Sequence, residues 1–299
     1  MTPDDLKEKI SGGLISFPVT PFDAENRFAP DIFGRHIDWL GGYGPAAQFV
    51  AGGAGEMFSL RPDEFGPVIR AAKEAAPKTP LVSGCGYGTE MAIQIARDAE
   101  KDGADGILLL PHYLVAAPQA GIRAHVKAVA DAVGIGVILY NRGAAKFTAD
   151  TLAVLCEECP NVIGFKDGAG DLAVAREVIA KIGDRLTYLE GMPTAELYAE
   201  AYMAAGFSTY SSAVFNFVPD LATRFFKAVL QKDRVLIDQL LKSFYYPFVA
   251  LRDRGEGYAV SAIKAGVRLR GFDVGPVRSP LTDLSKAEED MLMKLIDSA

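Results

Sequence analysis

Short apolar segments alternate with longer helical patterns along most of this chain, and that alternation limits the possible folds. Eight segments of six residues each are apolar nearly throughout, namely 14–19, 47–52, 80–85, 106–111, 136–141, 162–167, 186–191 and 209–214. Segments with apolar residues at helical spacing, such as 90–103 and 118–134, lie between them. Strands that are apolar on both faces are typical of a parallel sheet covered by helices. Eight strand–helix units in about 220 residues therefore predict an α/β fold, the (β/α)8 TIM barrel.

The strand pattern stops near residue 220, and the rest of the chain has helical spacing. We therefore expect a barrel over residues 1–225 and a C-terminal helical extension over 226–299. An open, doubly wound sheet is the alternative. Against it, no G-x-G-x-x-G motif opens the first strand–helix turn, where FPVTPF (17–22) stands instead.

Composition and charge limit the classes of partner. The 299 residues carry a formal net charge of −7 and no Lys/Arg-rich run, so the chain lacks the basic surface of a nucleic-acid-binding protein. The apolar runs are far shorter than the ~20 residues of a membrane-spanning helix, and the N-terminus does not read as a signal peptide. Three cysteines are too few for a disulfide framework, which is typical of a reducing compartment. We expect a cytoplasmic protein that binds neither nucleic acid nor membrane.

Residue types that bind metals are present but scattered. Cys156 and Cys159 form a C-x-x-C without a second pair of ligands, and the histidines (36, 112 and 125) show no metal-ligand spacing. We therefore expect no metal site.

Lys166 lies in the apolar segment VIGFKDG, where a lysine has no packing reason to occur. Burial disfavours the ammonium form and lowers the pKa of the amine. An uncharged amine condenses with a ketone to give an imine, which withdraws electrons from the adjoining carbon once it is protonated. The alternative is a strand-end lysine whose stem packs in the protein while its ammonium reaches solvent.

Tyr140 ends the preceding apolar segment at a matching height, 26 residues before Lys166. In a TIM barrel the active site lies at the C-terminal ends of the strands. A phenol there can shuttle protons during imine formation and at the adjoining carbon. The alternative is an aromatic side chain that caps the barrel core. The pairing favours Tyr140 and Lys166 as catalytic residues.

The glycine-rich segment GGAGE (52–56) follows a strand and precedes a helix. Such a turn can aim backbone N–H groups at an anion, although glycine-rich turns also occur for steric reasons. Gly53, Ala54 and Gly55 are therefore candidates for binding a substrate carboxylate. We expect Glu56 to cap or hydrogen-bond locally rather than to act as an acid.

Other polar residues follow the predicted strands. Arg142 comes directly after the strand of Tyr140 and is a candidate for holding a second carboxylate, with a surface ion pair as the alternative. Tyr113 follows the fourth strand. The eighth strand supplies Ser211 and Ser212, with Asn216 just beyond.

Three motifs together carry a resemblance to a known family: the GGAGE turn, the YN pair at 140–141 and GFKD at 164–167. Their combination resembles the dihydrodipicolinate synthase / N-acetylneuraminate lyase family over essentially the whole chain. That family implies a Schiff-base (β/α)8 barrel with a C-terminal helical extension, assembled as a homotetramer or homodimer. Within it, the segments 51–60 and 210–219 are similar to the branch that dehydrates 5-dehydro-4-deoxyglucarate.

The resemblance implies a role for several of these residues. Lys166 matches the imine-forming lysine and Tyr140 the proton-shuttling tyrosine. Gly53 and Ala54 fall where the family binds the carboxylate beside the substrate ketone, although the synthases have paired threonines there, so a hydroxyl relay from this turn is missing. Tyr113 matches a tyrosine that reaches the proton relay of the synthases across a dimer interface.

Ser212 and Asn216 occupy the region of the eighth strand that lines the cavity in this family. Ala145 stands where the synthases use an arginine for a distal carboxylate. Because this arginine is replaced by alanine, we do not expect the synthase reaction. Arg142 and Lys146 remain as candidates for binding a distal carboxylate.

The resemblance to this branch implies a decarboxylating dehydratase that converts 5-dehydro-4-deoxy-D-glucarate to 2,5-dioxopentanoate, water and CO2 through a Schiff base on Lys166. Because the imine is itself the electron sink, no cofactor is expected, and the partner is a small-molecule keto sugar diacid. Two alternatives remain: a class I aldolase or lyase that releases pyruvate from a 2-keto-3-deoxy sugar acid, and a non-catalytic barrel that binds sugar acids.

Overall fold

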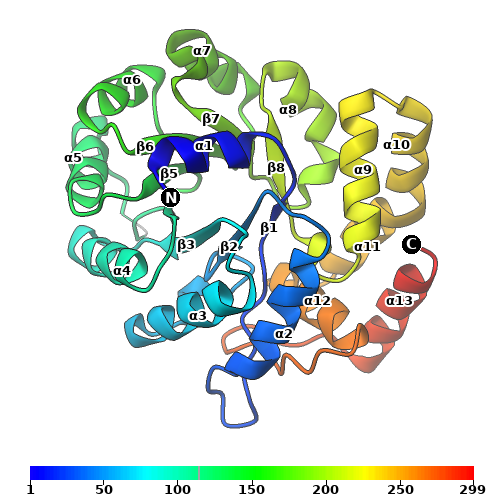
Figure 1. Ribbon diagram of the computed structural model, residues 1–299. Helices are drawn as coiled ribbons and strands as arrows, with labels where there is room; N and C mark the ends of the chain where they lie inside the picture. Colours follow the sequence, from blue (N-terminus) through cyan, green and yellow to red (C-terminus); the bar gives the residue numbers. More distant parts are fainter. Residues whose placement is uncertain (114) are drawn as a thin grey trace.

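The computed structural model describes residues 1–113 and 115–299. In this part of the chain, eight parallel strands close into a barrel in sequence order (Figure 1). They are β1 (Ile15–Ser16), β2 (Ala47–Val50), β3 (Leu81–Cys85), β4 (Gly106–Leu109), β5 (Gly136–Asn141), β6 (Val162–Asp167), β7 (Thr187–Glu190) and β8 (Thr209–Ser212). The predicted TIM barrel is confirmed, and β5 and β6 have the bounds expected from the sequence. β1 is shorter than expected because the nitrogen of Pro18 carries no hydrogen to donate to a neighbouring strand.

A helix follows each strand and covers the outside of the barrel. These helices are α2 (Pro30–Gly41), α3 (Pro62–Ala75), α4 (Thr89–Lys101), α5 (Gln119–Ala130), α6 (Ala149–Glu158), α7 (Leu172–Ile182), α8 (Ala199–Ala205) and α9 (Pro219–Gln231). Their first turns carry the expected start signals: proline opens α2, α3 and α9, and the side chains of Thr148 and Asp171 cap α6 and α7.

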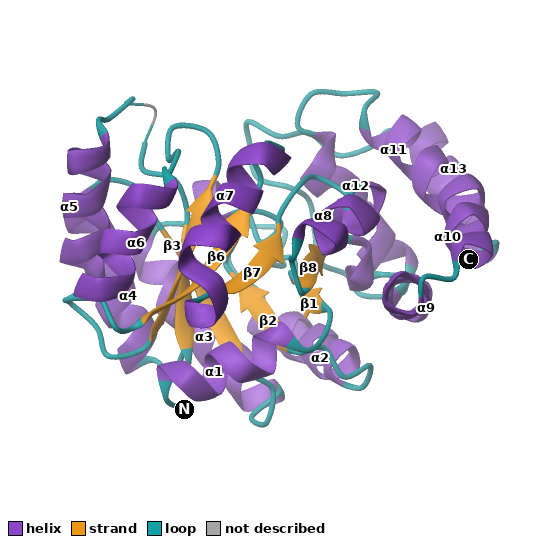
Figure 2. Cartoon of the chain, turned by 90° about the horizontal axis from the view of Figure 1, so that it is seen from above, coloured by secondary structure: helices purple, strands orange, loops and turns teal. Residues whose placement is uncertain are grey.

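The N-terminal helix α1 (Pro3–Ser11) closes the end of the barrel at which the strands begin (Figure 2). Leu6 and Ile10 are fully buried and pack with interior side chains of the barrel such as Val82 and Ile138. Leu6 lies so close to β4 that a Cβ on Gly106 would stand 2.5 Å from its Cδ2 atom. The floor of the barrel is therefore an apolar plug, and its open mouth lies at the other end of the strands.

The helical extension comprises α10 (Arg234–Leu240), α11 (Tyr246–Arg252), α12 (Tyr258–Leu269) and α13 (Lys286–Asp297), with a π-helical turn at Leu241–Tyr245 before α11. It packs beside α9 and β8 through a shared aromatic core, in which the rings of Phe217 and Phe248 lie 5.8 Å apart. The boundary expected between residues 225 and 226 falls inside α9. The extension is therefore continuous with the barrel core at this point.

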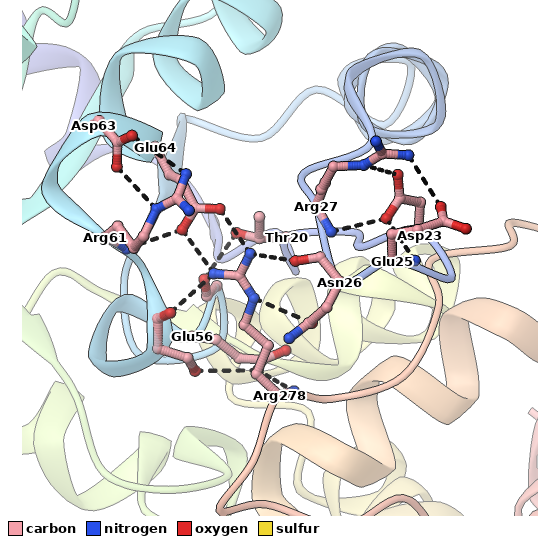
Figure 3. A network of polar contacts seen from close by, with 12 residues as sticks. Thr20, Asp23, Glu25, Asn26, Arg27, Glu56, Arg61, Asp63, Glu64 and Arg278 are labelled. Carbon is pink, nitrogen blue, oxygen red and sulfur yellow. Dashed lines mark hydrogen bonds and ion pairs between the residues drawn. The ribbon is translucent and has the colours of Figure 1, made fainter.

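A buried polar cluster joins the extension to the turn after β2, and we call it the seam: Glu56, Glu64, Lys264 and Arg278. Lys264 on α12 donates to Glu56 Oε1 at 2.6 Å, and both side chains are fully buried. The guanidinium of Arg278 donates to both carboxylate oxygens of Glu64 at 2.6 and 2.7 Å (Figure 3). The ring of Phe22 faces both cations, 4.1 Å from Lys264 Nζ and 3.8 Å from Arg278 Cζ.

Glu56 makes the local hydrogen bond expected for it, and it also has partners that the sequence did not indicate. Ser59 Oγ supplies a local contact at 3.3 Å, but the shorter contact comes from Lys264, 208 residues away in the chain. The backbone amide of Arg278 adds a third contact at 3.0 Å. Because these partners come from the extension, the sequence around the turn could not reveal them.

Candidate active site

Lys166 and Tyr140 lie side by side at the mouth of the barrel. They are direct partners in the register between β6 and β5, so their side chains project to the same, inner face. Both line a cavity of about 480 Å³. The structure thus brings together the two residues that the sequence favoured as catalytic.

The amine of Lys166 is held among aromatic rings. The side chain is 3% exposed, and Nζ lies 3.9 Å from the ring centroid of Phe17 and 4.7 Å from that of Tyr140. Burial lowers the pKa of Lys166 to about 7; Glu190 opposes this shift and Arg142 adds to it. Much of this amine is therefore uncharged at neutral pH, in the form that attacks a ketone.

Two glycines make room for this pair. A Cβ on Gly191 would stand 2.5 Å from Lys166 Cε, and one on Gly168 would stand 2.8 Å from the Tyr140 hydroxyl. That hydroxyl donates to the carbonyl of Gly191 at 2.8 Å and accepts from Arg142 Nη1 at 3.0 Å. Burial raises the pKa of Tyr140, and Arg142 partly offsets the shift. The phenol is thus oriented beside the amine and keeps its proton.

The GGAGE turn forms another part of the cavity wall, where Gly53 and Ala54 line the space. Within the described residues, neither of their amide N–H groups has a hydrogen-bond acceptor. The turn is held from behind, because Thr20 Oγ1 donates to the Gly55 carbonyl at 2.7 Å. Gly55 itself is buried against Ala51, whose nitrogen a Cβ on Gly55 would approach to 3.0 Å. The turn is therefore fixed on one side and leaves two amide N–H groups unused, and its binding of an anion stays a prediction.

A row of polar side chains stands on the outer face of the sheet, one residue beyond Lys166. Asn141, Asp167, Glu190 and Tyr210 are successive register partners across β5 to β8. Asp167 accepts from Asn141 Nδ2 at 2.6 Å and from the hydroxyl of Tyr202 at 2.5 Å. Burial raises the pKa of Glu190 well above its usual range. These contacts fix the strand ends that carry Lys166 and Tyr140.

Ser212 and Asn216 do not line the cavity, contrary to the placement expected for them. Ser212 Oγ donates to Glu196 at 2.5 Å behind the sheet. Asn216 is fully buried, where its side chain donates to the Phe17 carbonyl and accepts from the backbone of Val19. Side chains alternate along a strand, so the neighbouring Ser211 faces the cavity instead.

Tyr113 is 66% exposed on the loop after β4, away from the cavity of its own chain. Its role across a dimer interface involves a second copy and stays a prediction. Arg142 lines the cavity, whereas Lys146 is exposed elsewhere. Of the two cations considered for a distal carboxylate, only Arg142 lines the cavity, and its binding of a carboxylate stays a prediction.

Sequence reasoning missed the contribution of the extension to this cavity. Arg252 and Phe248 on α11, Val260 and Ile263 on α12, and Thr194 after β7 all line it. Arg252 ends an apolar helical pattern that looked like ordinary core packing. No local signal shows that this helix reaches the mouth of the barrel, because its position depends on tertiary packing.

The described part of the chain shows neither a metal-binding cluster nor a membrane-spanning helix. No group of three or more His, Cys, Asp or Glu residues is arranged there to hold a metal ion, and the three cysteines are not in disulfides. None of the helices in that part has both the length and the apolar character needed to cross a bilayer.

Comparisons with known proteins agree with this architecture. A family profile described as "Dihydrodipicolinate synthetase family" matches residues 10–299. A "probable 5-dehydro-4-deoxyglucarate dehydratase" from Cereibacter sphaeroides is 60% identical over 298 residues, which is 100% of this chain and 99% of that protein. A protein of the same description from Chelativorans sp. is also 60% identical over 298 residues, with 100% and 99% covered. Dihydrodipicolinate synthase from Bacillus clausii shares the fold with a TM-score of 0.87 at 23% identity, over 98% of this chain and 99% of that one.

Proposed function

The chain belongs to the dihydrodipicolinate synthetase family, and we propose that it is a hydro-lyase acting on 5-dehydro-4-deoxy-D-glucarate. The products are 2,5-dioxopentanoate, water and CO2. Two kinds of observation support this substrate. Curated relatives at 60% identity carry the corresponding description, and two arginines line a cavity that also holds the amine.

The reaction begins at Lys166, whose uncharged amine attacks the C5 ketone of the substrate. Loss of water from the carbinolamine gives the imine, and protonation turns it into an electron sink. Tyr140, oriented by Arg142 and the Gly191 carbonyl, is placed to move protons between these intermediates. The C6 carboxylate beside the ketone is bound by the amide N–H groups of Gly53 and Ala54.

Elimination follows from the electron sink. Removal of a C4 proton gives the enamine, which expels the C3 hydroxyl together with a proton as water. The resulting conjugated imine accepts the electron pair of the C1–C2 bond when C1 leaves as CO2. Protonation at C3 and C4, collapse of the C2 enol to an aldehyde and hydrolysis of the imine give 2,5-dioxopentanoate and regenerate Lys166. No electrons enter or leave the system, so the reaction requires no redox partner.

The observation that carries this proposal is the buried amine of Lys166 beside the oriented phenol of Tyr140. We would supply purified protein with 5-dehydro-4-deoxy-D-glucarate and couple 2,5-dioxopentanoate to an aldehyde dehydrogenase. The expected result is one aldehyde for each CO2 released. Borohydride added during turnover should attach the substrate skeleton to Lys166, as read by peptide mass spectrometry.

Two results would overturn the proposal. Folded protein that forms no aldehyde from this substrate is not such a dehydratase, whatever it binds. Pyruvate release, detected with lactate dehydrogenase, would instead identify carbon–carbon cleavage through the same imine.

The assembly expected from the resemblance, a homotetramer or homodimer, remains part of the proposal. Tyr113 lies exposed on a loop where it could meet a second copy. Light scattering on the eluted protein would measure the mass of the particle directly. A monomer that is fully active would remove any role for Tyr113 across an interface.

A further inference from the structure

Two guanidinium groups reach the cavity from different parts of the fold. Arg142 follows β5, and Arg252 ends α11 in the helical extension. Arg142 lies next to the reacting end, where its Nη1 donates to the Tyr140 hydroxyl at 3.0 Å. Arg252 lies on the wall formed by the extension, among the apolar side chains of Phe248 and Val260. The two cations therefore occupy different parts of the cavity wall.

The guanidinium of Arg252 is held in place before any ligand arrives. Its side chain is 14% exposed, Nη1 donates to Thr194 Oγ1 at 2.5 Å, and Nε donates to Asp253 at 2.7 Å. Within the described residues, its Nη2 group has no acceptor. A planar guanidinium with unused donors is suited to bind a carboxylate.

Thr194 adds an independent indication of function. Its backbone is left-handed, with φ 52° and ψ 67°, although the residue is β-branched and 6% exposed. This conformation is unfavourable for a β-branched residue, and residues that adopt it are found preferentially at functional sites. Here it turns the Thr194 hydroxyl toward Arg252, so the strained residue and the cation form one unit on the cavity wall.

We propose that Arg252, positioned by Thr194, binds the carboxylate at the end of the substrate away from the ketone. Arg252 thereby selects six-carbon 2-oxo diacids over 2-oxo monoacids of the same length. This inference rests on the proposed imine at Lys166, which fixes the other end of the chain. Because the distal carboxylate leaves as uncharged CO2, the contact favours substrate binding rather than bond breaking.

The test uses two stable 2-oxo acids, and its readout does not depend on turnover. 2-Oxoadipate has the carbon skeleton and both carboxylates of the proposed substrate, and 2-oxohexanoate lacks only the distal carboxylate. The concentration of each that gives half-maximal borohydride trapping on Lys166 is measured by mass spectrometry. We expect the unaltered protein to favour 2-oxoadipate by about 10- to 100-fold.

Arg252→Met should remove that preference and leave trapping by pyruvate unchanged, because pyruvate has no distal group. Thr194→Val should weaken the preference by a smaller factor, since Arg252 loses its hydroxyl partner but keeps its charge. Lys146→Met, which removes an exposed cation outside the cavity, is the matched control and should leave the preference intact.

Trapping by pyruvate shows whether each variant still has a folded, reactive site. If Arg252→Met keeps the full preference for 2-oxoadipate, or Lys146→Met loses it, the assignment of Arg252 is wrong. If the unaltered protein is not trapped even with pyruvate, the proposed imine itself fails. The two failures are therefore distinguishable.

Discussion

The molecule buries two lysines in opposite ways, one at the barrel mouth and one in the seam. Lys166 and Lys264 are 3% and 0% exposed, and each has an aromatic ring about 4 Å from its nitrogen. Lys264 donates to the carboxylate of Glu56 and to the Pro276 carbonyl. Among the described residues, Lys166 has no ion-pair partner, and it lines the cavity instead.

The difference shows that burial alone does not bring an amine to a cavity. Burial lowers the pKa of both lysines, to about 7 for Lys166 and about 8 for Lys264, where Glu56 opposes the shift. The two lysines differ in the hydrogen-bond partners of their nitrogens and in whether the nitrogen faces a cavity. In the seam the ammonium of Lys264 is bonded to a carboxylate and a carbonyl, whereas at the mouth the amine of Lys166 has no ion-pair partner in the described part of the chain and faces a cavity.

Removing each lysine in turn should separate the two roles most clearly. Lys166→Met should abolish trapping by 2-oxo acids and lower turnover by at least ~10³-fold, because the nucleophile is gone. Lys264→Met should keep trapping in the molecules that remain folded. A borohydride adduct that persists in Lys166→Met would show that another amine forms the imine.

For the stability of the fold we expect the opposite order, with the larger loss on removal of Lys264. Lys264→Met leaves the Glu56 carboxylate buried without a cation, which we expect to lower the free energy of unfolding by about 3–5 kcal/mol. Denaturation in urea measures this loss. The double variant Glu56→Gln/Lys264→Met should recover part of it, because no unpaired charge remains. A single variant as stable as the unaltered protein would show that the pair contributes nothing.

A change of pH should alter the rate of trapping of Lys166 less than removal of the lysine does. The rate of trapping of Lys166 by low concentrations of pyruvate should fall toward about tenfold per pH unit below pH 7, as the amine becomes protonated. Because the folded pKa lies below the unfolded value, the unfolded chain binds more protons between pH 7 and about 10.5. Lys166 therefore lowers the free energy of unfolding, relative to Lys166→Met, by its full amount below pH 7. This loss becomes smaller as the pH rises from 7 to about 10.5. A rate independent of pH between 5 and 7 would contradict the lowered pKa.

The placement of Lys166 beside Tyr140 could be predicted from the sequence because its signal is local. Lys166 is conspicuous in an apolar strand, and the bounds of β5 and β6 follow directly from their apolar runs. The same argument applied to α12 would have drawn attention to Lys264, whose helix is also apolar, so an isolated lysine does not by itself identify a nucleophile. The pairing with Tyr140 on the adjacent strand made the difference.

The other site residues depend on information that a single sequence does not hold. Ser211 and Ser212 are both small and polar, and only the register of β8 decides which one faces the cavity, since a shift of one residue reverses every side chain. Whether the side chain of Arg252 reaches the cavity depends on how the extension packs against the barrel. Contacts of that kind join segments far apart in the chain and leave no periodic pattern.

The plug formed by α1 determines at which end of the barrel ligands enter and leave. With Leu6 and Ile10 buried at the floor of the barrel, a ligand reaches the cavity from the mouth, and a product leaves toward the mouth as well.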